Sequence, residues 1–214
     1  WLVPSYEEAD KAMAGKGGKM LLELVQENGI QPLAFGESGF RQVTNNVNPI
    51  LVPSDLEGLK IRVPTIKMFI ALFKSLGADP TAINFGELFA ALQQGTADGQ
   101  ENPPDVIASA RVQEVQKYMT MWNASYDPII MSASTKLWSD LNENEKDIFN
   151  KAAIEAMDYQ KQLSREKNNK LVEEFAEKME ITTLSPEQIA VFRKKAQPVY
   201  DEYEEIIGLE LLEA

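Results

Sequence analysis

The residues most able to do chemistry fall in the second quarter of the chain. Arg62 lies within Leu59 to Val63, whose alternating pattern predicts a strand, and its planar guanidinium suits a carboxylate. Phe85 is expected where a strand gives way to a helix, the place at which α/β sheets bind ligands. Asn102 precedes two prolines and offers an amide donor and acceptor. An arginine, an aromatic ring and an amide together indicate the binding of a small carboxylate.

Each of these residues also has a structural interpretation. Arg62 could form a structural salt bridge or lie at an exposed edge, and Phe85 could belong to the core. Arg41 follows Gly39-Phe40 on another predicted strand and could reach the same cleft or be exposed on the surface. Glu101 could pair with either arginine, in a structural or a ligand-binding role. We expect the prolines after Asn102 to free its amide from helix or sheet pairing.

An enzyme is the alternative class of function. Glu87 and Glu101 are 14 residues apart and could form a carboxylate pair in a hydrolase or lyase, provided that one carboxyl has a raised pKa. The chain has no cysteine and no histidine, which excludes thiol nucleophiles, imidazole bases and zinc-finger spacings. No metal-ligand cluster or phosphate-cradling loop is evident, so the sequence predicts no metal, no cofactor and no catalytic residue outside this pair.

Charge and hydropathy narrow the partners further. The chain has 33 acidic and 21 basic residues and a net charge of -12, which disfavours nucleic acid in the absence of a basic patch. Its apolar runs are far shorter than the roughly 20 residues of a membrane span. The lack of cysteine suits an oxidising compartment. The chain begins at Trp1, which we interpret as the mark of a processed or excised product.

The hydrophobic periodicity predicts an α/β protein. Strand, helix, strand and helix follow one another between residues 59 and 94, which is typical of parallel βαβ units. Elsewhere we expect a broken helix at 6–28, strands at 30–35, 41–45, 118–122, 128–134 and 181–184, a helix from Thr65 to Gly77, a helix at 142–179 and a C-terminal helix bent at Pro198. A helical scaffold protein is a third interpretation and requires these strands to be absent.

The helix expected at 142–179 is too long for the rest of the chain. It would extend for about 55 Å, whereas a compact chain of this size is roughly 45 Å across. Either the helix kinks, most easily at Asn168-Asn169 because asparagine is a poor helix former, or it spans a larger body.

Five segments in order resemble the substrate-binding proteins of TRAP transporters, the DctP-type family. The segments are Gly39-Phe-Arg-Gln42, Asp55-Leu-Glu-Gly-Leu-Lys-Ile-Arg-Val-Pro64, Phe85-Gly-Glu-Leu-Phe-Ala-Ala-Leu-Gln93, Asp98-Gly-Gln-Glu-Asn-Pro103 and Glu114-Val-Gln-Lys-Tyr118. The resemblance implies a periplasmic-binding-protein-like fold, with two α/β domains around a cleft and a long helix across both. It implies that Arg62 binds the ligand carboxylate bidentately, Arg41 assists, Phe85 packs on the ligand and Asn102 hydrogen-bonds to it.

The same resemblance implies a periplasmic receptor that closes around an organic acid and delivers it to TRAP transporter membrane subunits. One departure concerns the ligand, because Trp122-Asn-Ala124 stands where the family often has Thr-Asn-His. Trp122 and Asn123 are therefore added to the candidate binding residues. The particular acid is left open.

The second departure is that the family's first third is missing. We expect residues 1–38 and 128–167 to be the remainder of the first domain, and residues 39–127 and 168–214 to form the second. The incomplete domain would expose an apolar face. We therefore predict that a further segment of the protein, or a second copy, covers this face and that five residues are buried in the complete assembly. These are Ile129, Ile130, Met131, Phe149 and Met157.

Overall fold

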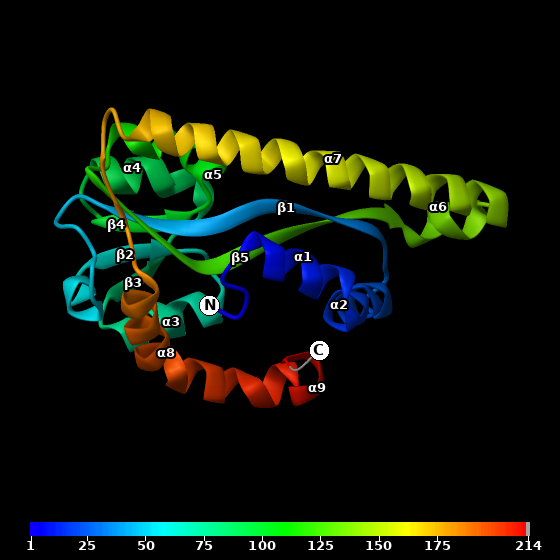
Figure 1. The fold of residues 1–214 in the computed structure, drawn as a ribbon, viewed down its shortest axis with the longest axis horizontal. Helices are drawn as coiled ribbons and strands as arrows, with labels where there is room; N and C mark the ends of the chain where they lie inside the picture. Colours follow the sequence, from blue (N-terminus) through cyan, green and yellow to red (C-terminus); the bar gives the residue numbers. More distant parts are fainter. Residues whose placement is uncertain (213–214) are drawn as a thin grey trace.

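Two long strands organise the computed structural model, which describes residues 1–212. Strands β1 (Ile30–Asn45) and β5 (Tyr118–Ser134) run antiparallel to each other, and α6 (Thr135–Asp140) and the start of α7 (Glu143–Phe175) extend beyond them (Figure 1). The two strands lie in a six-stranded mixed sheet with the order β3-β2-β4-β1-β5-β6. The predicted α/β class is thus confirmed, and the helical scaffold is excluded.

The short strands build one end of this sheet. They are β2 (Lys60–Val63), β3 (Asp79–Ala82), β4 (Gly99–Asn102) and β6 (Glu180–Thr183). Strand β2 is parallel to both β3 and β4, while β4 is antiparallel to β1 and β6 is parallel to β5. The predicted βαβ unit is present, because helix α3 (Lys67–Leu76) joins β2 to β3 and ends at Gly77 with a φ of 100°. Its N-cap is Ile66 and not the expected Thr65.

Two predictions about strands are wrong, and in both cases the structure contains more strand than we expected. The strands expected as separate pairs are continuous in β1 and β5, because bulges at Pro32/Ala34, Glu37/Gly39 and Arg41/Val43 absorb the irregular residues without ending the pairing. The prolines after Asn102 were expected to free it from sheet pairing, yet Asn102 ends the buried strand β4. The prolines follow this strand, so they remove no donor from it.

The helices cover the two sides of the long strands. Helices α1 (Tyr6–Ala14) and α2 (Lys16–Glu27) are separated at Gly15, as predicted. The others are α4 (Leu88–Gln93), α5 (Pro104–Ser109), α6 (Thr135–Asp140), α7 (Glu143–Phe175), α8 (Pro186–Ile207) and α9 (Leu209–Leu212), with short 3-10 turns at Pro53–Leu56, Phe85–Glu87 and Val112–Glu114. Capping boxes begin α7 and α8, and Pro198 lies inside α8.

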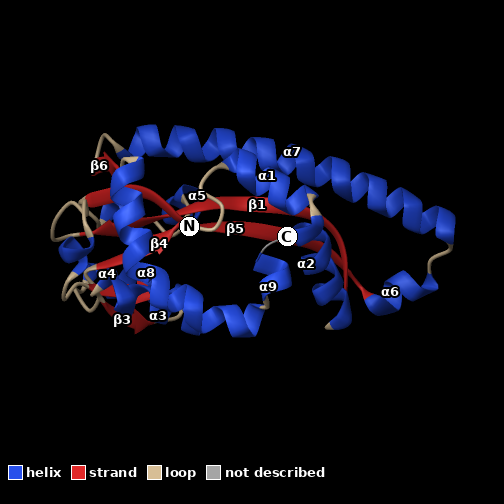
Figure 2. Cartoon of the chain, turned by 60° about the horizontal axis from the view of Figure 1, so that its bottom comes forward, coloured by secondary structure: helices blue, strands red, loops and turns tan. Residues whose placement is uncertain are grey.

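Helix α7 is the predicted long helix. Its 33 residues extend for about 50 Å, along the long strands and past them toward α6 (Figures 1 and 2). Asn168, expected at its weakest point, is only 3% exposed and anchors the helix. Its amide nitrogen donates to the Ser38 carbonyl at 2.9 Å, and its amide oxygen accepts from the Asp105 backbone at 2.8 Å.

The buried core lies at the short-strand end of the sheet. One hydrophobic cluster surrounds Trp122, with Phe73 and Phe192, and a second surrounds Leu88 and Phe175. Within the described chain, neither cluster has a buried member from residues 2–42 or 125–152. The part of the chain assigned to an incomplete domain therefore has no comparable core of its own.

Within residues 1–212, the apolar side chains expected on the face of this incomplete domain are exposed or half-buried. Ile129 and Phe149 are 44% and 45% exposed, and Ile130, Met131 and Met157 are half-buried. None of the five is buried by the chain itself. Their burial by a further segment or a second copy stays a prediction.

Two glycines of β1 allow α7 and α1 to approach the strand. A Cβ at Gly39, whose φ is +112°, would meet the Asn168 amide nitrogen at 2.8 Å and the Tyr6 hydroxyl at 3.0 Å. At Gly36 it would meet the Gln160 amide oxygen at 2.5 Å. Larger residues at these positions would separate the strand from its helices.

We expect Gly39→Ala to lower the free energy of unfolding by about 1–3 kcal/mol, because the new methyl group combines backbone strain with a steric clash. Gly86→Ala is the control, since nothing lies within 4 Å of a Cβ there and the backbone φ is not positive. It should change stability by less than about 0.5 kcal/mol. Chemical denaturation measures both, and equal effects would contradict this account of β1.

Candidate ligand-binding site

Arg62 presents a buried cation without a carboxylate partner. It lies on β2 and is 3% exposed, and its Nε donates to the Ile83 carbonyl at 2.8 Å. The two terminal nitrogens make no hydrogen bond to the described residues, and none of the described carboxylates lies within ion-pair distance. These nitrogens are also not enclosed, so they retain contact with solvent. The structural salt bridge considered for Arg62 does not form here, and its fork is available to an anion.

The loop after β3 brings Phe85 to the same end of the sheet. The Ile83 backbone joins the loop to β2, accepting from Arg62 and donating to the Val63 carbonyl at 3.3 Å. Phe85 begins a 3-10 turn two residues later and is 49% exposed. It is not a core residue, and its ring is free to contact a ligand at the carboxyl ends of β2 and β3.

Arg41 differs from Arg62 because each of its three guanidinium nitrogens already donates to a neighbouring residue. Nε and Nη2 donate to the Glu101 carboxylate at 2.5 and 2.8 Å, and Nη1 donates to Asp127 at 2.5 Å. Nη2 also reaches the Glu101 carbonyl and the Asn102 amide oxygen, each at 2.9 Å. The guanidinium lies 5.1 Å from the centre of the Phe69 ring. Arg41 therefore holds three strands together and has little capacity left for a ligand.

Glu101 pairs with Arg41 and not with Arg62. It is 2% exposed, and both carboxylate oxygens accept from Arg41. Burial raises the pKa of the Glu101 carboxyl to about 7, and the hydrogen bonds from Arg41 oppose this shift. For Arg41, burial lowers the pKa, but the two neighbouring carboxylates together raise it above its ordinary value.

Asn102 belongs to a buried polar network. Besides accepting from Arg41, it donates to the Gln100 amide oxygen at 2.5 Å. Gln100 donates to the Thr44 hydroxyl at 3.1 Å, and Thr44 donates to Gln116 at 2.9 Å. Asn102 is 4% exposed, so the structure shows an orienting residue in place of the freely presented amide that we expected.

Trp122 and Asn123 lie differently from what the sequence suggested. The Trp122 ring is 1% exposed and packs edge-on against Trp1 and Phe192, so it is a core residue and does not face a cleft. Asn123 adopts a φ of 48° and accepts from the Gln42 side chain at 2.7 Å. Its amide nitrogen makes no hydrogen bond to the residues that the structure describes, which leaves a neutral donor available.

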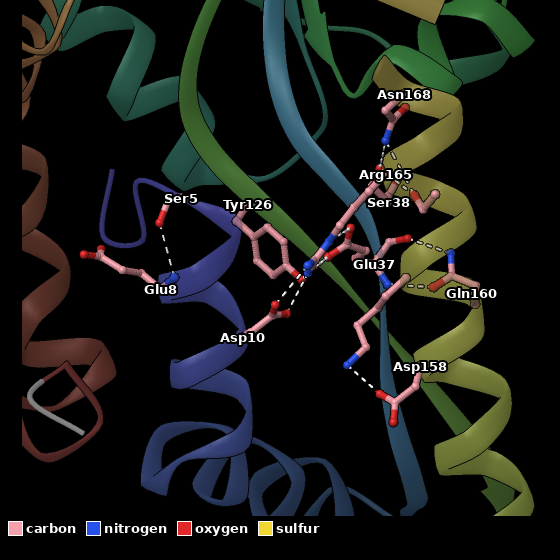
Figure 3. Close-up of polar contacts among 12 residues, drawn as sticks. Ser5, Glu8, Asp10, Glu37, Ser38, Tyr126, Asp158, Gln160, Arg165 and Asn168 are labelled. Atoms are coloured by element: carbon pink, nitrogen blue, oxygen red, sulfur yellow. Dashed lines mark hydrogen bonds and ion pairs between the residues drawn. The ribbon is translucent and has the colours of Figure 1, made fainter. Parts of the chain in front are cut away.

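A second ionic group joins four elements at the middle of the long strands, and the sequence analysis missed it (Figure 3). Arg165 of α7 donates to both oxygens of Glu37 on β1, each at 2.8 Å. It also reaches both oxygens of Asp10 on α1, at 2.6 and 2.9 Å. Tyr126 of β5 donates to Glu37 at 2.9 Å, and the guanidinium lies 4.5 Å from the centre of the Tyr6 ring. Glu37 is completely buried.

An apolar cavity of about 540 Å³ is separate from the candidate site. It is lined by residues of several elements, including Leu21, Met68, Tyr126 and Tyr203, and by none of the arginines described above, but it shares Phe69 with the surroundings of Arg41. No group of acidic residues in the described chain is arranged to hold a metal ion. None of the helices in residues 1–212 has the length and apolarity that a bilayer span needs.

The chain belongs to the family described as bacterial extracellular solute-binding protein, family 7 (DctP), whose model matches residues 1–206. A C4-dicarboxylate-binding periplasmic protein, DctP, of Rhodobacter capsulatus is 34% identical over 216 residues, covering 100% of this chain and 65% of that protein. The chain thus spans slightly less than two thirds of this relative's length. The resemblance seen in the sequence is confirmed.

Solved structures support the same assignment. A TRAP periplasmic solute-binding protein from Ochrobactrum anthropi, with its C-terminus bound in the ligand-binding pocket, is 40% identical with a TM-score of 0.93, covering 100% of this chain and 67% of that one. Another from Polaromonas, bound to D-erythronate, is 35% identical with a TM-score of 0.88 and corresponding coverages of 99% and 70%. The fold is therefore that of TRAP periplasmic solute-binding proteins.

Proposed function

We propose that this protein is a receptor for a small organic acid and that Arg62 binds the ligand carboxylate through its two terminal nitrogens. The observation that supports this most is the buried guanidinium of Arg62, which has a solvent-accessible fork and no carboxylate partner in the described chain. A planar fork matches a carboxylate with two parallel charge-assisted hydrogen bonds. Phe85 packs against the ligand, and Asn123 offers a further donor.

Arg41, Glu101 and Asn102 then act as a supporting group. Arg41 ties β1 to β4 and β5, and Asn102 is held by both Arg41 and Gln100. This arrangement fixes the sheet end from which Arg62 projects. It replaces the direct ligand contacts expected for Arg41 and Asn102.

The domain division and the partners follow the same proposal. Residues 1–38 and 128–167 belong to one domain and residues 39–127 and 168–214 to the other, with the ligand between them. The protein works in the periplasm and delivers its ligand to the membrane subunits of a TRAP transporter. The Rhodobacter relative is named as a periplasmic binding protein and the Ochrobactrum relative as a TRAP periplasmic solute-binding protein, which supports the proposed location and transporter class.

A hydrolase or lyase using Glu87 and Glu101 is less well supported. Although the pKa of Glu101 is raised, both of its carboxylate oxygens are occupied by Arg41 and the side chain is buried. Glu87 is exposed on the turn after Phe85. The relatives are named as receptors and not as enzymes.

Calorimetry of the complete protein with a panel of carboxylates, including D-erythronate and succinate, tests the proposal. We expect at least one acid to bind, and nuclear magnetic resonance to show that it is recovered unchanged. A panel without any binding, or a bound acid that is chemically converted, would contradict a receptor function.

A further inference from the structure

The charges around Arg62 are balanced within the chain. Arg41 is paired with both Glu101 and Asp127, whereas Arg62 has no carboxylate at ion-pair distance among the described residues. Two cations therefore share this end of the sheet with two carboxylates. Burial is the main cause that lowers the pKa of Arg62; among its charged neighbours, Glu101 raises this pKa and Arg41 lowers it, so both lie within electrostatic range of Arg62. The formal charges of these four side chains cancel, and the fork of Arg62 is the one left without a carboxylate among them.

Asp127 places one of these negative charges where a ligand can meet it. Its side chain is 33% exposed, whereas that of Glu101 is 3% exposed. Asp127 lies on β5 opposite Gly39, in the part of the strand that leads from the short-strand end of the sheet toward residues 128–134. A ligand held by Arg62 with its body extending toward β5 approaches a carboxylate and not a free cation.

From this balance we propose that the ligand is a hydroxylated monocarboxylate, and that Asp127 excludes acids with a second carboxylate at the far end. The inference rests on the proposed function, because it requires Arg62 to hold the first carboxylate. A second carboxylate would find the remaining guanidinium, that of Arg41, already occupied and would be repelled by Asp127. A hydroxyl group instead can donate to Asp127 or accept from the free amide nitrogen of Asn123.

A matched pair of acids tests this inference directly. D-Erythronate and meso-tartrate share a four-carbon chain and the configuration of both internal carbons, and they differ only in a terminal hydroxymethyl or carboxylate group. Calorimetry on the complete protein should show D-erythronate binding at least about tenfold more tightly. Equal affinity, tighter binding of meso-tartrate or no binding of either acid would overturn the proposed ligand class.

Asp127→Asn tests the residue to which we assign the discrimination. Removing this charge also frees a donor of Arg41, so the affinity ratio of D-erythronate to meso-tartrate should fall by about tenfold. Asp140→Asn, an equal charge change at an exposed position at the end of α6, should leave the ratio unchanged. An unchanged ratio in Asp127→Asn would overturn the role of Asp127, as would an equal fall in Asp140→Asn.

The failure of this inference can be distinguished from the failure of the receptor function. If meso-tartrate or succinate binds as tightly as D-erythronate and Arg62→Ala removes that binding, the carboxylate receptor stands and the ligand class is wrong. If no carboxylate binds at all, both are wrong. The comparison of the two acids on the unaltered protein needs no variant to fold.

Discussion

Replacing Arg62 by alanine is expected to weaken carboxylate binding by about 2–5 kcal/mol, a loss of roughly 30-fold or more in affinity. Both terminal nitrogens of Arg62 are free to pair with the ligand, whereas those of Arg41 are already bonded to Glu101 and Asp127. Calorimetry on the complete protein measures the loss.

Two further substitutions separate the geometry of Arg62 from its charge. Arg62→Lys keeps the positive charge but loses the fork, so its affinity should lie between those of the unaltered protein and Arg62→Ala. Arg111→Ala removes a surface arginine whose side chain is 69% exposed, and it should leave binding unchanged. Undiminished affinity in Arg62→Ala would show that the carboxylate is held elsewhere.

Replacing Arg165 by methionine is expected to lower the free energy of unfolding by about 3–5 kcal/mol. The substitution leaves the fully buried Glu37 without the guanidinium that pairs with both of its oxygens. It also removes the links to Asp10 and to the Tyr6 ring, so α1 and α7 lose a common contact with the long strands. Chemical denaturation of the complete protein measures this effect.

The cause of the lower stability of Arg165→Met can be tested by also removing the charge of Glu37, which that variant leaves unpaired. Glu37→Gln added to Arg165→Met should restore part of the stability, because a neutral amide costs less to bury than an unpaired carboxylate. Arg111→Met, which breaks an exposed pair with Glu114, should leave the free energy of unfolding nearly unchanged, because solvent screens that pair. A double variant no more stable than Arg165→Met would show that lost packing, and not the buried charge, dominates.

The sequence predicted correctly those features that depend on residues close together in the chain. The alternation of Leu59 to Val63 placed Arg62 correctly on a strand, and the junction before Gly86 placed Phe85 correctly at a strand-to-helix turn. The helices α1, α2, α7 and α8 were predicted because their periodicity and caps are local.

What the sequence could not indicate depends on strand register. Asp127 meets Arg41 because Arg41 is opposite Ser125 and a side chain two residues further along β5 lies on the same face. Strand register also explains why Glu101 pairs with Arg41 and not with Arg62, because β4 is paired with β1 in the sheet. Had β1 and β5 been recognised as continuous antiparallel strands, Asp127 could have been found.

Two other positions, Trp122 and Glu37, are buried in a way that the sequence did not indicate. Trp122 was added to the candidate binding residues, yet its ring fills the core between Trp1, Phe73 and Phe192. Glu37 lies between the strands expected at 30–35 and 41–45, in a segment of β1 whose glycines allow α7 and α1 to approach. The residues that pack against Trp122 and the residue that pairs with Glu37 are far from them in sequence, so hydrophobic periodicity could not indicate these contacts.

A crystal structure of the complete protein with its co-purified ligand tests the central claim most directly. We predict a carboxylate whose two oxygens each accept a hydrogen bond from a terminal nitrogen of Arg62, at about 2.7–2.9 Å. The Phe85 ring should contact the same ligand. A ligand whose carboxylate is bound elsewhere, with the Arg62 fork left in solvent or paired with an acidic residue of the protein, would contradict the account.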